Sequence, residues 1–388
     1  MDHTLIRYQA KEIYPILCNS LYKVLIDQKG YPSSMLNFGT FERNFFMNGL
    51  VIDLKTGNIL KLGENKQVLR AYFGETCLSK FQIEEAYGNP PVYDIFDGNF
   101  PFNEYYFCCL SFFECYFPLV FAKMVEFKRQ NQASLTPEEL KQILDDGFYA
   151  VGVNYSHSTE EFYYPIIEFG HYYKSVIESI DKVIYKQDRM LAVLRHLKSE
   201  GKPLFLVSDS HYEYVGTLME HAYGKNWLDI FDFALLHAKK PSFFNSSTRP
   251  FKEIDHQKAN KMGPEVRELK RHLMYTEGNA GLLKKNLDMI TGGKGKILYF
   301  GDHYAYDILA AKDLKDWDTV CVIEEMGDLD LGKDYDGRIW GHWQYEETSD
   351  GEVIPTYWYS KMMKRADKVT SGVDSKEMLD FFYERQEN

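Results

Sequence analysis

The second half of the chain alternates short apolar runs with segments of helical periodicity, and this alternation limits the fold more than any other feature. Four apolar runs have the length expected of buried β-strands: residues 203–207, 231–236, 296–300 and 318–323. Helical spacing places Val215, Leu218 and Ala222 on one face after the first run, and Ile308, Leu309, Ala311 and Leu314 follow the third run on a predicted helix. Because short apolar strands joined by helices form parallel sheets with right-handed crossovers, we predict an α/β fold with a Rossmann-like core and a parallel sheet.

The first two hundred residues do not share this alternation. They mix an extended region at 50–62 with an aromatic, helix-like region at 103–129 and a polar helical stretch near 134–144. At 388 residues the chain is long enough for two domains, and we expect a mixed, largely helical cap inserted into the α/β core. The predicted parts are a first core segment at 1–15, the cap region at 16–190, the α/β core at 191–330 and a C-terminal extension at 331–388.

The charge of the chain argues against one class of partner. Lys and Arg number 45 against 57 Asp and Glu, which gives a formal net charge of −12. Proteins that bind a nucleic-acid polymer rely on many Lys and Arg contacts to phosphates, so we expect no such polymer as a partner. A small-molecule nucleotide needs only one local cationic pocket and stays open as the ligand.

The cysteines and the longest apolar stretch bear on location. None of the six cysteines forms a C-x-x-C pair, which argues against a zinc site and favours a reducing cytoplasm. Residues 105–122 are strongly apolar, but Glu114 lies among them and Pro118 follows it. A carboxylate at the centre of a bilayer costs roughly 2.5–3.5 kcal/mol, so we predict a buried helix or an interface here and no membrane span. The aromatic side chains of this region leave a homo-oligomer open.

Polar residues follow three of the apolar runs, at the point where each strand would end. Ser208 directly follows the first run, Lys240 comes after the second, and Asp302 comes after the third. Ligands of open α/β sheets bind at the carboxyl ends of the strands, so we expect these side chains to lie together. With Asp2 they supply the carboxylates, hydroxyl and ammonium that hold a phosphate and a divalent metal. Taken singly, each of these four residues also fits a turn, a helix cap, a surface position or a chain end. Their order along the chain favours a shared site for phosphate and metal.

Asp2-x-Thr4 has the look of a loop that leaves a strand, as in phosphoryl transfer through an aspartate. When transfer passes through an aspartate, one carboxylate attacks phosphorus and a second, two residues later, protonates the leaving oxygen and then deprotonates water. Lys240 and a Mg²⁺ held partly by Asp302 would offset the repulsion between phosphate and carboxylates. The Ser208 hydroxyl and the backbone N–H groups after it would bind phosphate oxygens.

The ordered motifs resemble those of the haloacid dehalogenase (HAD) superfamily. That superfamily shows Asp-x-Asp-x-Thr, a strand ending in Ser or Thr, Lys before Pro, and Gly-Asp with a second Asp five residues on. The local sequence is similar to the cytosolic purine 5′-nucleotidases, which prefer IMP and GMP. The similar stretches are residues 2–4, 49–53, 57–61, 206–214, 239–244 and 297–308. The resemblance extends to about Glu325 and implies a Mg²⁺-dependent enzyme that hydrolyses purine nucleoside monophosphates through an aspartyl-phosphate.

The resemblance implies a role for each matching position. Asp2 becomes the acid and base, with its backbone carbonyl on the metal. Ser208 becomes a phosphate binder and Lys240 the charge-balancing lysine. Asp302 becomes a metal ligand, and Asp307 orients Lys240 or the waters of the metal. The implied substrate contacts are Thr4, Asp209, Ser210, Asp181, Tyr185 and Phe127.

Recognition of the base depends on the less specific part of the resemblance. Asp181 and Tyr185 match the helix that contacts the purine in this family, and Phe127 is taken as the aromatic that stacks on it. The alternatives are a solvated Asp181 and core-packed Tyr185 and Phe127. Ile177 occupies the place of a family Arg, which bears on the purine preference. The attacking Asp of the family falls one residue before Met1, so we expect it among preceding residues.

Two other functions stay open. The same chemistry could act on another small phosphomonoester, such as a sugar phosphate. A protein that lacks the attacking Asp would instead be a catalytically silent, nucleotide-binding HAD protein.

Overall fold

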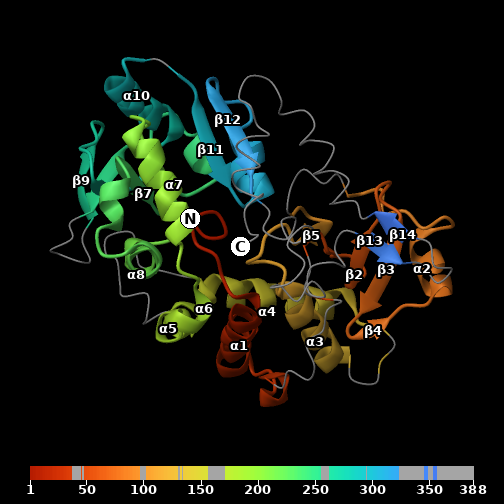
Figure 1. Cartoon of the computed structure of the whole chain (residues 1–388). Helices are drawn as coiled ribbons and strands as arrows, with labels where there is room; N and C mark the ends of the chain where they lie inside the picture. Colours follow the sequence, from red (N-terminus) through yellow and green to blue (C-terminus); the bar gives the residue numbers. More distant parts are fainter. Residues whose placement is uncertain are drawn as a thin grey trace. The chain divides into compact units, whose positions relative to one another are not determined.

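The chain divides into two compact units, each described here by itself (Figure 1). The first unit combines residues 1–30 with 148–322, and the second combines 31–147 with 323–388. The computed structural model describes residues 1–36, 45, 48–96, 102–129, 132, 134–155, 171–254, 262–293, 295–322, 345–347 and 353–355. The four predicted parts of the chain, with boundaries after residues 15, 190 and 330, stay a prediction.

The larger sheet of the first unit is mixed, with the strand order β6-β7-β10-β8-β9. Its strands are β6 (Phe205–Val207), β7 (Phe233–Leu236), β10 (Leu273–Glu277), β8 (Phe251–Ile254) and β9 (Met262–Val266). β6, β7 and β10 run parallel, with Leu206 beside Ala234 and Ala234 beside Met274. β7 is buried along its whole length, as expected of a central parallel strand.

A second, two-stranded sheet of this unit pairs β11 (Ile297–Gly301) with β12 (Trp317–Cys321) in parallel. β6, β7, β11 and β12 lie within two residues of the runs predicted from sequence, and the mixed α/β class is confirmed. The expectation of a wholly parallel sheet is wrong at β8 and β9, which are antiparallel. β8 carries the polar, half-buried residues Lys252 and Glu253 and so lacks the continuous apolar run typical of a buried parallel strand.

Helices connect the strands of the first unit. They are α1 (Ala10–Lys29), α5 (His171–Glu178), α6 (Ile180–Val183), α7 (Asp188–Ser199), α8 (Tyr212–Tyr223), α9 (Ser242–Asn245) and α10 (Ala280–Thr291), with a 3₁₀ turn at Trp227–Ile230. α8 buries Val215, Leu218 and Ala222, which confirms its predicted apolar face. The Asn279 side chain caps α10 by accepting a hydrogen bond from the Leu282 N–H at 2.9 Å.

The helix predicted after β11 takes a different form. Residues Tyr304–Leu309 make a π-helical turn, so the expectation of a regular helix around Ile308 is wrong. π-helical turns are uncommon and recur at functional sites, where the wider turn redirects a side chain. Here the turn brings Asp307 against the backbone of Gly301.

Aromatic side chains dominate the packing beside β11. Phe244, Tyr299 and Trp317 meet edge to face, with ring centroids between 5.4 and 6.0 Å apart. Each such pair contributes roughly 0.5–1.5 kcal/mol beyond the burial of apolar area. Through these ring contacts the β11–β12 pair packs against α9, the helix that follows β7.

The second unit is built on a five-stranded antiparallel sheet with the order β4-β3-β2-β1-β5. Its strands are β1 (Val51–Asp53), β2 (Asn58–Leu62), β3 (Val68–Phe73), β4 (Thr76–Cys77) and β5 (Tyr106–Cys108). Its other elements are a 3₁₀ turn at Ser33–Leu36, α2 (Lys80–Tyr87), α3 (Phe117–Arg129), the first part of α4 (Pro137–Asn154) and the antiparallel pair β13 (Tyr345–Glu347) and β14 (Val353–Pro355). The extended region expected at 50–62 forms the β1–β2 hairpin, whose turn places Gly57 at φ 75°.

The region expected to be helical at 103–129 is only partly so. β5 comes first, and α3 begins at Phe117. Between them, Glu114 accepts hydrogen bonds from the backbone N–H groups of Leu110 at 2.8 Å and Ser111 at 3.1 Å. These bonds come before α3 and give the carboxylate two hydrogen-bond donors within an apolar stretch. In the part of the chain that the structure describes, no helix is long and apolar enough to cross a membrane.

Candidate active site

The loops that follow β6 and β7 are joined by hydrogen bonds at the carboxyl ends of the two strands. Ser208 directly follows β6, and its carbonyl accepts a bond from the Ala238 N–H at 3.0 Å. The Lys240 N–H donates to Asp209 Oδ1 at 2.8 Å. The predicted phosphate-binding loop and the predicted lysine loop are therefore neighbours, as expected for strand ends of one parallel sheet.

Lys240 and Asp307 form a buried ion pair. The Lys240 Nζ lies 2.7 Å from Asp307 Oδ1, and the two side chains are 11% and 1% exposed. The same oxygen accepts a hydrogen bond from the Tyr299 hydroxyl at 2.6 Å, while the His303 N–H donates to Oδ2 at 3.1 Å. The lysine predicted to balance charge is thus held by the carboxylate predicted to support it.

The electrostatics of this pair keep both partners charged. Burial by itself would lower the pKa of Lys240, but Asp307 and the nearby carboxylates of Asp209 and Asp302 raise it well above its usual value. Burial by itself would raise the pKa of Asp307, but the Lys240 charge and its hydrogen bonds lower it. A fixed ammonium therefore lies beside the strand ends at neutral pH.

The Asp302 carboxylate has no hydrogen-bond donor among the described residues. It directly follows β11, is half-buried, and accepts no hydrogen bond within the described residues. Burial raises its pKa, and the charge of Asp307 raises it further, while His3 and Lys240 partly offset both effects. The structure thus brings Asp302, Asp307 and Lys240 into one electrostatic centre.

This carboxylate fits a magnesium ion. Mg²⁺ prefers oxygen ligands, retains several waters and binds through one or two carboxylates together with a substrate phosphate. Groups of three or more His, Cys, Asp or Glu side chains that could form a protein cage are absent from the described residues. Asp302 and the backbone carbonyl of Asp2 would hold such an ion, and both assignments stay predictions.

Asp2 is oriented by two hydroxyl groups. Its Oδ1 accepts a hydrogen bond from Tyr8 at 2.5 Å, and its Oδ2 accepts one from Ser210 Oγ at 3.3 Å. Asp2 therefore lies beside the loop after β6, although 208 residues separate it from Ser210. Thr4 Oγ1 is a buried oxygen without a hydrogen-bond partner among the described residues. A buried hydroxyl of this kind is ready to bind a ligand oxygen.

The residues Ser208, Asp209 and Ser210, which follow β6, do not cap α8. The Ser208 side chain is buried, and its Oγ accepts a hydrogen bond from the Ser210 N–H at 3.2 Å. α8 begins only at Tyr212, after His211, and the His211 side chain makes no capping bond. The alternative reading of Ser208 as the N-cap is therefore wrong, and its hydroxyl proton is available to a phosphate oxygen.

Two of the three residues predicted to bind the base, Asp181 and Tyr185, lie close together in the chain, and Tyr185 pairs with the start of the chain. Tyr185 N donates to the Arg7 carbonyl at 3.1 Å, and the Arg7 guanidinium lies 5.5 Å over the Tyr185 ring. Asp181 is 92% exposed on α6, and its carboxylate lies 3.7 Å from His221 Nδ1. This supports the solvated alternative for Asp181. Phe127 belongs to the second unit, where it packs against Tyr31 with centroids 5.6 Å apart.

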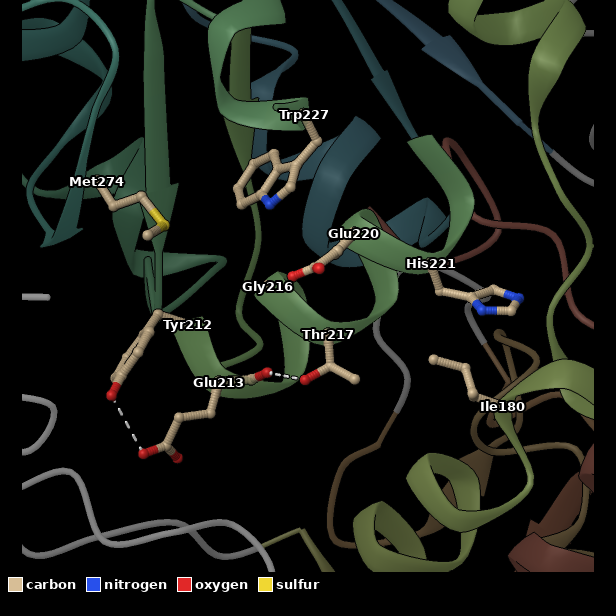
Figure 2. Close-up of a pocket in the computed structure, with 9 residues that line it drawn as sticks. All are labelled: Ile180, Tyr212, Glu213, Gly216, Thr217, Glu220, His221, Trp227 and Met274. Carbon is tan, nitrogen blue, oxygen red and sulfur yellow. Dashed lines mark hydrogen bonds between the residues drawn. The ribbon is translucent and has the colours of Figure 1, made fainter. Parts of the chain in front are cut away.

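The described cavity of this unit lies along α8 and has a volume of about 500 Å³ (Figure 2). Figure 2 shows Trp227 and Met274 on one side and His221 and Ile180 on the other. Its lining residues are Ile180, Tyr212, Glu213, Gly216, Thr217, Glu220, His221, Trp227 and Met274. None of these is a predicted catalytic residue, but the lining residue Ile180 precedes Asp181, and the lining residue His221 lies 3.7 Å from the Asp181 carboxylate.

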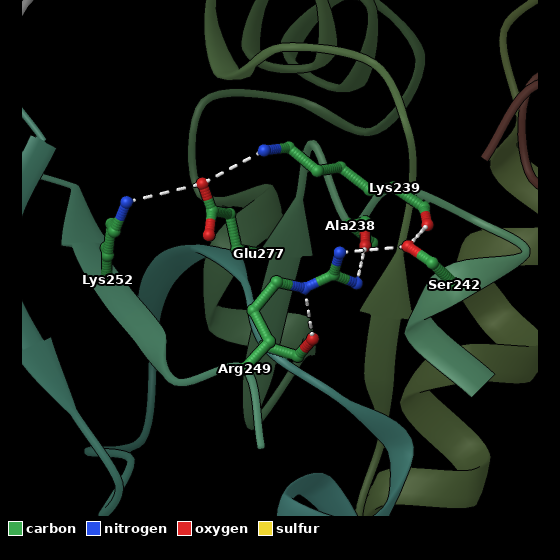
Figure 3. A network of polar contacts seen from close by, with 7 residues as sticks. Ala238, Lys239, Ser242, Arg249, Lys252 and Glu277 are labelled. Atoms are coloured by element: carbon green, nitrogen blue, oxygen red, sulfur yellow. Dashed lines mark hydrogen bonds and ion pairs between the residues drawn. The ribbon is translucent and has the colours of Figure 1, made fainter. Parts of the chain in front are cut away.

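The sequence analysis did not find the side chains that hold the loop of residues 238–242 in place (Figure 3). Arg249 donates to the Gly278 carbonyl at 2.9 Å, to Ser242 Oγ at 2.9 Å and to the Ala238 carbonyl at 3.0 Å. Glu277, at the end of β10, pairs with Lys239 at 3.2 Å and with Lys252 at 3.3 Å. These partners come from separate segments of the chain, so no local pattern in the sequence indicates them.

Known proteins share most of this chain. Residues 1–329 match the 5′ nucleotidase family. The Homo sapiens 5′-nucleotidase domain-containing protein 1 is 32% identical over 339 residues, covering 84% of this chain and 70% of that protein. The Bos taurus protein of that name is 30% identical, covering 85% and 72%. The Homo sapiens 5′-nucleotidase domain-containing protein 2 is 25% identical, covering 84% of this chain and 59% of its own length.

The α/β fold, the strand-end centre and these matches together define a phosphoric monoester hydrolase. The chain belongs to the 5′-nucleotidase family.

Proposed function

We propose that the protein is a Mg²⁺-dependent 5′-nucleotidase that hydrolyses purine nucleoside monophosphates of the IMP and GMP type to nucleoside and phosphate. The first unit would be a Rossmann-like HAD core, and the early region its cap. The observation that carries the proposal is the buried Lys240–Asp307 pair beside Asp302 and the loop after β6. A fixed ammonium, a carboxylate without a donor and free hydroxyls suit a phosphate dianion and its metal.

The phosphate would lie between the two strand-end loops. Lys240 offsets its charge, and the Ser208 and Thr4 hydroxyls and the Ser210 backbone bind its oxygens. Asp307 keeps Lys240 in place, because the ion pair and the Tyr299 hydrogen bond fix its carboxylate. Mg²⁺, held by Asp302 and the Asp2 carbonyl, would supply further charge neutralisation.

Asp2 would transfer protons in a two-step reaction. In the first step an attacking carboxylate displaces the nucleoside oxygen from phosphorus and forms an aspartyl-phosphate. Asp2 gives a proton to the leaving nucleoside oxygen and then takes one from the water that hydrolyses the intermediate. Its two hydrogen bonds, from Tyr8 and Ser210, hold it in place for both steps.

Release of phosphate by the purified full-length protein tests this function. With Mg²⁺ we expect IMP and GMP to be hydrolysed faster than pyrimidine monophosphates and hexose phosphates. Lys240→Met should lower kcat/KM at least about 100-fold, the usual cost of removing one electrostatic group from such a site. Lys239→Met is the matched control, since this neighbouring lysine pairs with Glu277 instead, and it should stay within about 3-fold of wild type. A wild-type protein that releases no phosphate from any monophosphate would support the catalytically silent alternative.

One observation favours a second substrate class. Asp181 is 92% exposed, and Ile177 stands where the resemblance expects an Arg. If these positions do not bind a purine, the same centre would act on another small phosphomonoester, such as a sugar phosphate. Faster hydrolysis of hexose phosphates than of IMP and GMP would establish this alternative.

The proposed location is the cytoplasm, with a small-molecule nucleotide as the ligand. All six cysteines are free thiols, which fits a reducing compartment. A homo-oligomer, suggested by the aromatic early region, stays a prediction that light scattering of the purified protein would test.

A further inference from the structure

A chain of tyrosine hydroxyls ends on the carboxylate of Asp2. Tyr8 donates to Asp2 Oδ1 at 2.5 Å. The hydroxyl oxygens of Tyr8 and Tyr214 are 3.2 Å apart, and those of Tyr214 and Tyr172 are also 3.2 Å apart. All three tyrosines are only 1% exposed. They come from the segment before α1, from α8 and from α5, so only the folded first unit brings them together.

The chain of hydroxyls has a direction, because each phenol carries one proton. Tyr8 donates its one hydroxyl hydrogen bond to Asp2 Oδ1, so it accepts a hydrogen bond from the hydroxyl of Tyr214. Tyr214 in turn accepts from Tyr172. Burial raises the pKa of all three phenols well above the usual value, and the charge of Asp2 raises that of Tyr8 further. The three hydroxyls therefore keep their protons.

Aromatic packing holds these hydroxyls in place. The ring of Tyr214 lies 4.7 Å from Tyr173, and that of Tyr172 lies 5.3 Å from Tyr155. The Tyr8 ring packs against His3 with centroids 4.9 Å apart. In a close-packed interior these rings have little freedom to rotate away from Asp2.

We propose that Tyr8, held by Tyr214 and Tyr172, is the positioning residue that orients the Asp2 carboxylate for proton transfer. With Oδ1 engaged by Tyr8, Oδ2 is the oxygen that faces Ser210, at 3.3 Å. As the bond from phosphorus to the leaving oxygen breaks, the proton moves from Oδ2 to that oxygen. As water attacks the aspartyl-phosphate, its proton moves to Oδ2 and inorganic phosphate leaves. This inference rests on the proposed function, in which Asp2 is the acid and base.

A comparison of leaving groups tests the positioning role. A nucleoside leaves as an alcohol and needs the proton, whereas p-nitrophenolate leaves readily without one. kcat/KM reports the first step, in which this difference acts. For Tyr8→Phe we expect kcat/KM for IMP to fall about 10- to 100-fold, part of the usual contribution of a general acid. For p-nitrophenyl phosphate the same variant should stay within about 3-fold of wild type.

The chain offers a matched control in Tyr223. Its hydroxyl donates to the Leu5 carbonyl at 2.5 Å, so Tyr223→Phe removes a buried hydrogen bond beside the same segment without touching Asp2. This variant should lose stability but keep the wild-type ratio of kcat/KM for the two substrates. Tyr214→Phe leaves the Tyr8–Asp2 bond in place and should show an intermediate loss on IMP alone. It serves as the test if Tyr8→Phe does not fold.

The outcomes distinguish a failure of the Tyr8 positioning role from a failure of the proposed phosphatase function. Equal losses on both substrates in Tyr8→Phe, or in Tyr214→Phe if the first variant does not fold, would overturn the positioning role and leave the phosphatase intact. A wild-type protein that hydrolyses neither substrate would remove the proposed function itself, before any variant is compared.

Discussion

The Asp307 side chain lies directly against the backbone of Gly301, so that a Cβ at residue 301 would stand 2.4 Å from the Asp307 Cβ and 2.7 Å from its Oδ2. Distances this short do not occur between real atoms of this kind, and the carboxylate would have to move. Because the same carboxylate holds Lys240 at 2.7 Å, the absence of a side chain at Gly301 is part of what positions the lysine.

Gly301→Ala should therefore displace Asp307 and weaken catalysis. We expect kcat/KM to fall roughly 100-fold and the free energy of unfolding to fall by about 1–3 kcal/mol, as for other overpacked sites. Phosphate release and urea unfolding measure the two effects. Gly216→Ala in α8 is the control, because no atom lies within 4 Å of its added Cβ, and alanine in a helix stabilises by roughly 0.5–1 kcal/mol. Equal behaviour of the two variants would contradict this role of Gly301.

Asp307→Asn should expose the contribution of the ion pair to stability as a function of pH. The pKa of Asp307 is lowered by Lys240, so its contribution is fully present above the unfolded pKa of about 3.9 and is lost as pH falls toward the folded value. We expect the variant to be less stable by about 3–5 kcal/mol between pH 5 and 8, because it leaves a buried ammonium without its partner. The difference should shrink below about pH 4. A difference that stays constant down to pH 3 in urea unfolding would argue against this pair as its source.

Arg249→Met should loosen the loop that carries Lys240. The guanidinium makes three hydrogen bonds across this loop, and bonds from a charged donor contribute roughly 1.5–3 kcal/mol each, not additively. We expect kcat to fall about 10-fold, with a loss of about 3 kcal/mol in stability. Arg271→Met is the control for activity, since this arginine pairs with Asp232 and not with the loop of Lys240. Removing a partner of that buried carboxylate should also lower stability, but it should leave kcat unchanged. Wild-type kcat in folded Arg249→Met would show that the brace does not position Lys240.

Asp302→Asn should abolish stabilisation by Mg²⁺. An ion that binds only the folded state raises Tm, and Mg²⁺ at about 100 times its Kd would stabilise by about 2.7 kcal/mol. Thermal unfolding with and without Mg²⁺ should show this rise for wild type but not for Asp302→Asn. Asp318→Asn, which removes the partner of Lys296 in an exposed pair, should keep the full rise. A Tm of wild type that does not respond to Mg²⁺, Mn²⁺ or Ca²⁺ would count against Asp302 as a metal ligand.

The sequence predicted the parts of the fold that local patterns determine. The strands β6, β7, β11 and β12 were found because each is a short apolar run, and α8 because its apolar face repeats with helical spacing. Ser208, Lys240 and Asp302 were placed at strand ends by the same reasoning.

The rest depends on side-chain contacts that the spacing of apolar residues does not reveal. The β8–β9 hairpin has polar middle residues and resembles a loop in sequence, and Glu114 lies in a helix-like pattern but accepts hydrogen bonds from backbone N–H groups before α3. The π-helical turn that packs Asp307 on Gly301 has the same apolar residues as a regular helix would, so its sequence does not distinguish the two. The contacts of Tyr8 with Tyr214 and of Arg249 with Gly278 join segments that no window of the sequence contains.

The bond between Asp2 and Ser210 also bears on how the protein is made. Asp2 and Ser210 are separated by 208 residues in the chain, and Lys240 and Asp307 are separated by 67. At about 5–20 residues per second, a ribosome needs on the order of 15–60 s to reach Asp307 after the first residues have emerged. Until Ser210 has been made, Asp2 lacks this partner, and a message cut short before Asp307 would yield no working enzyme.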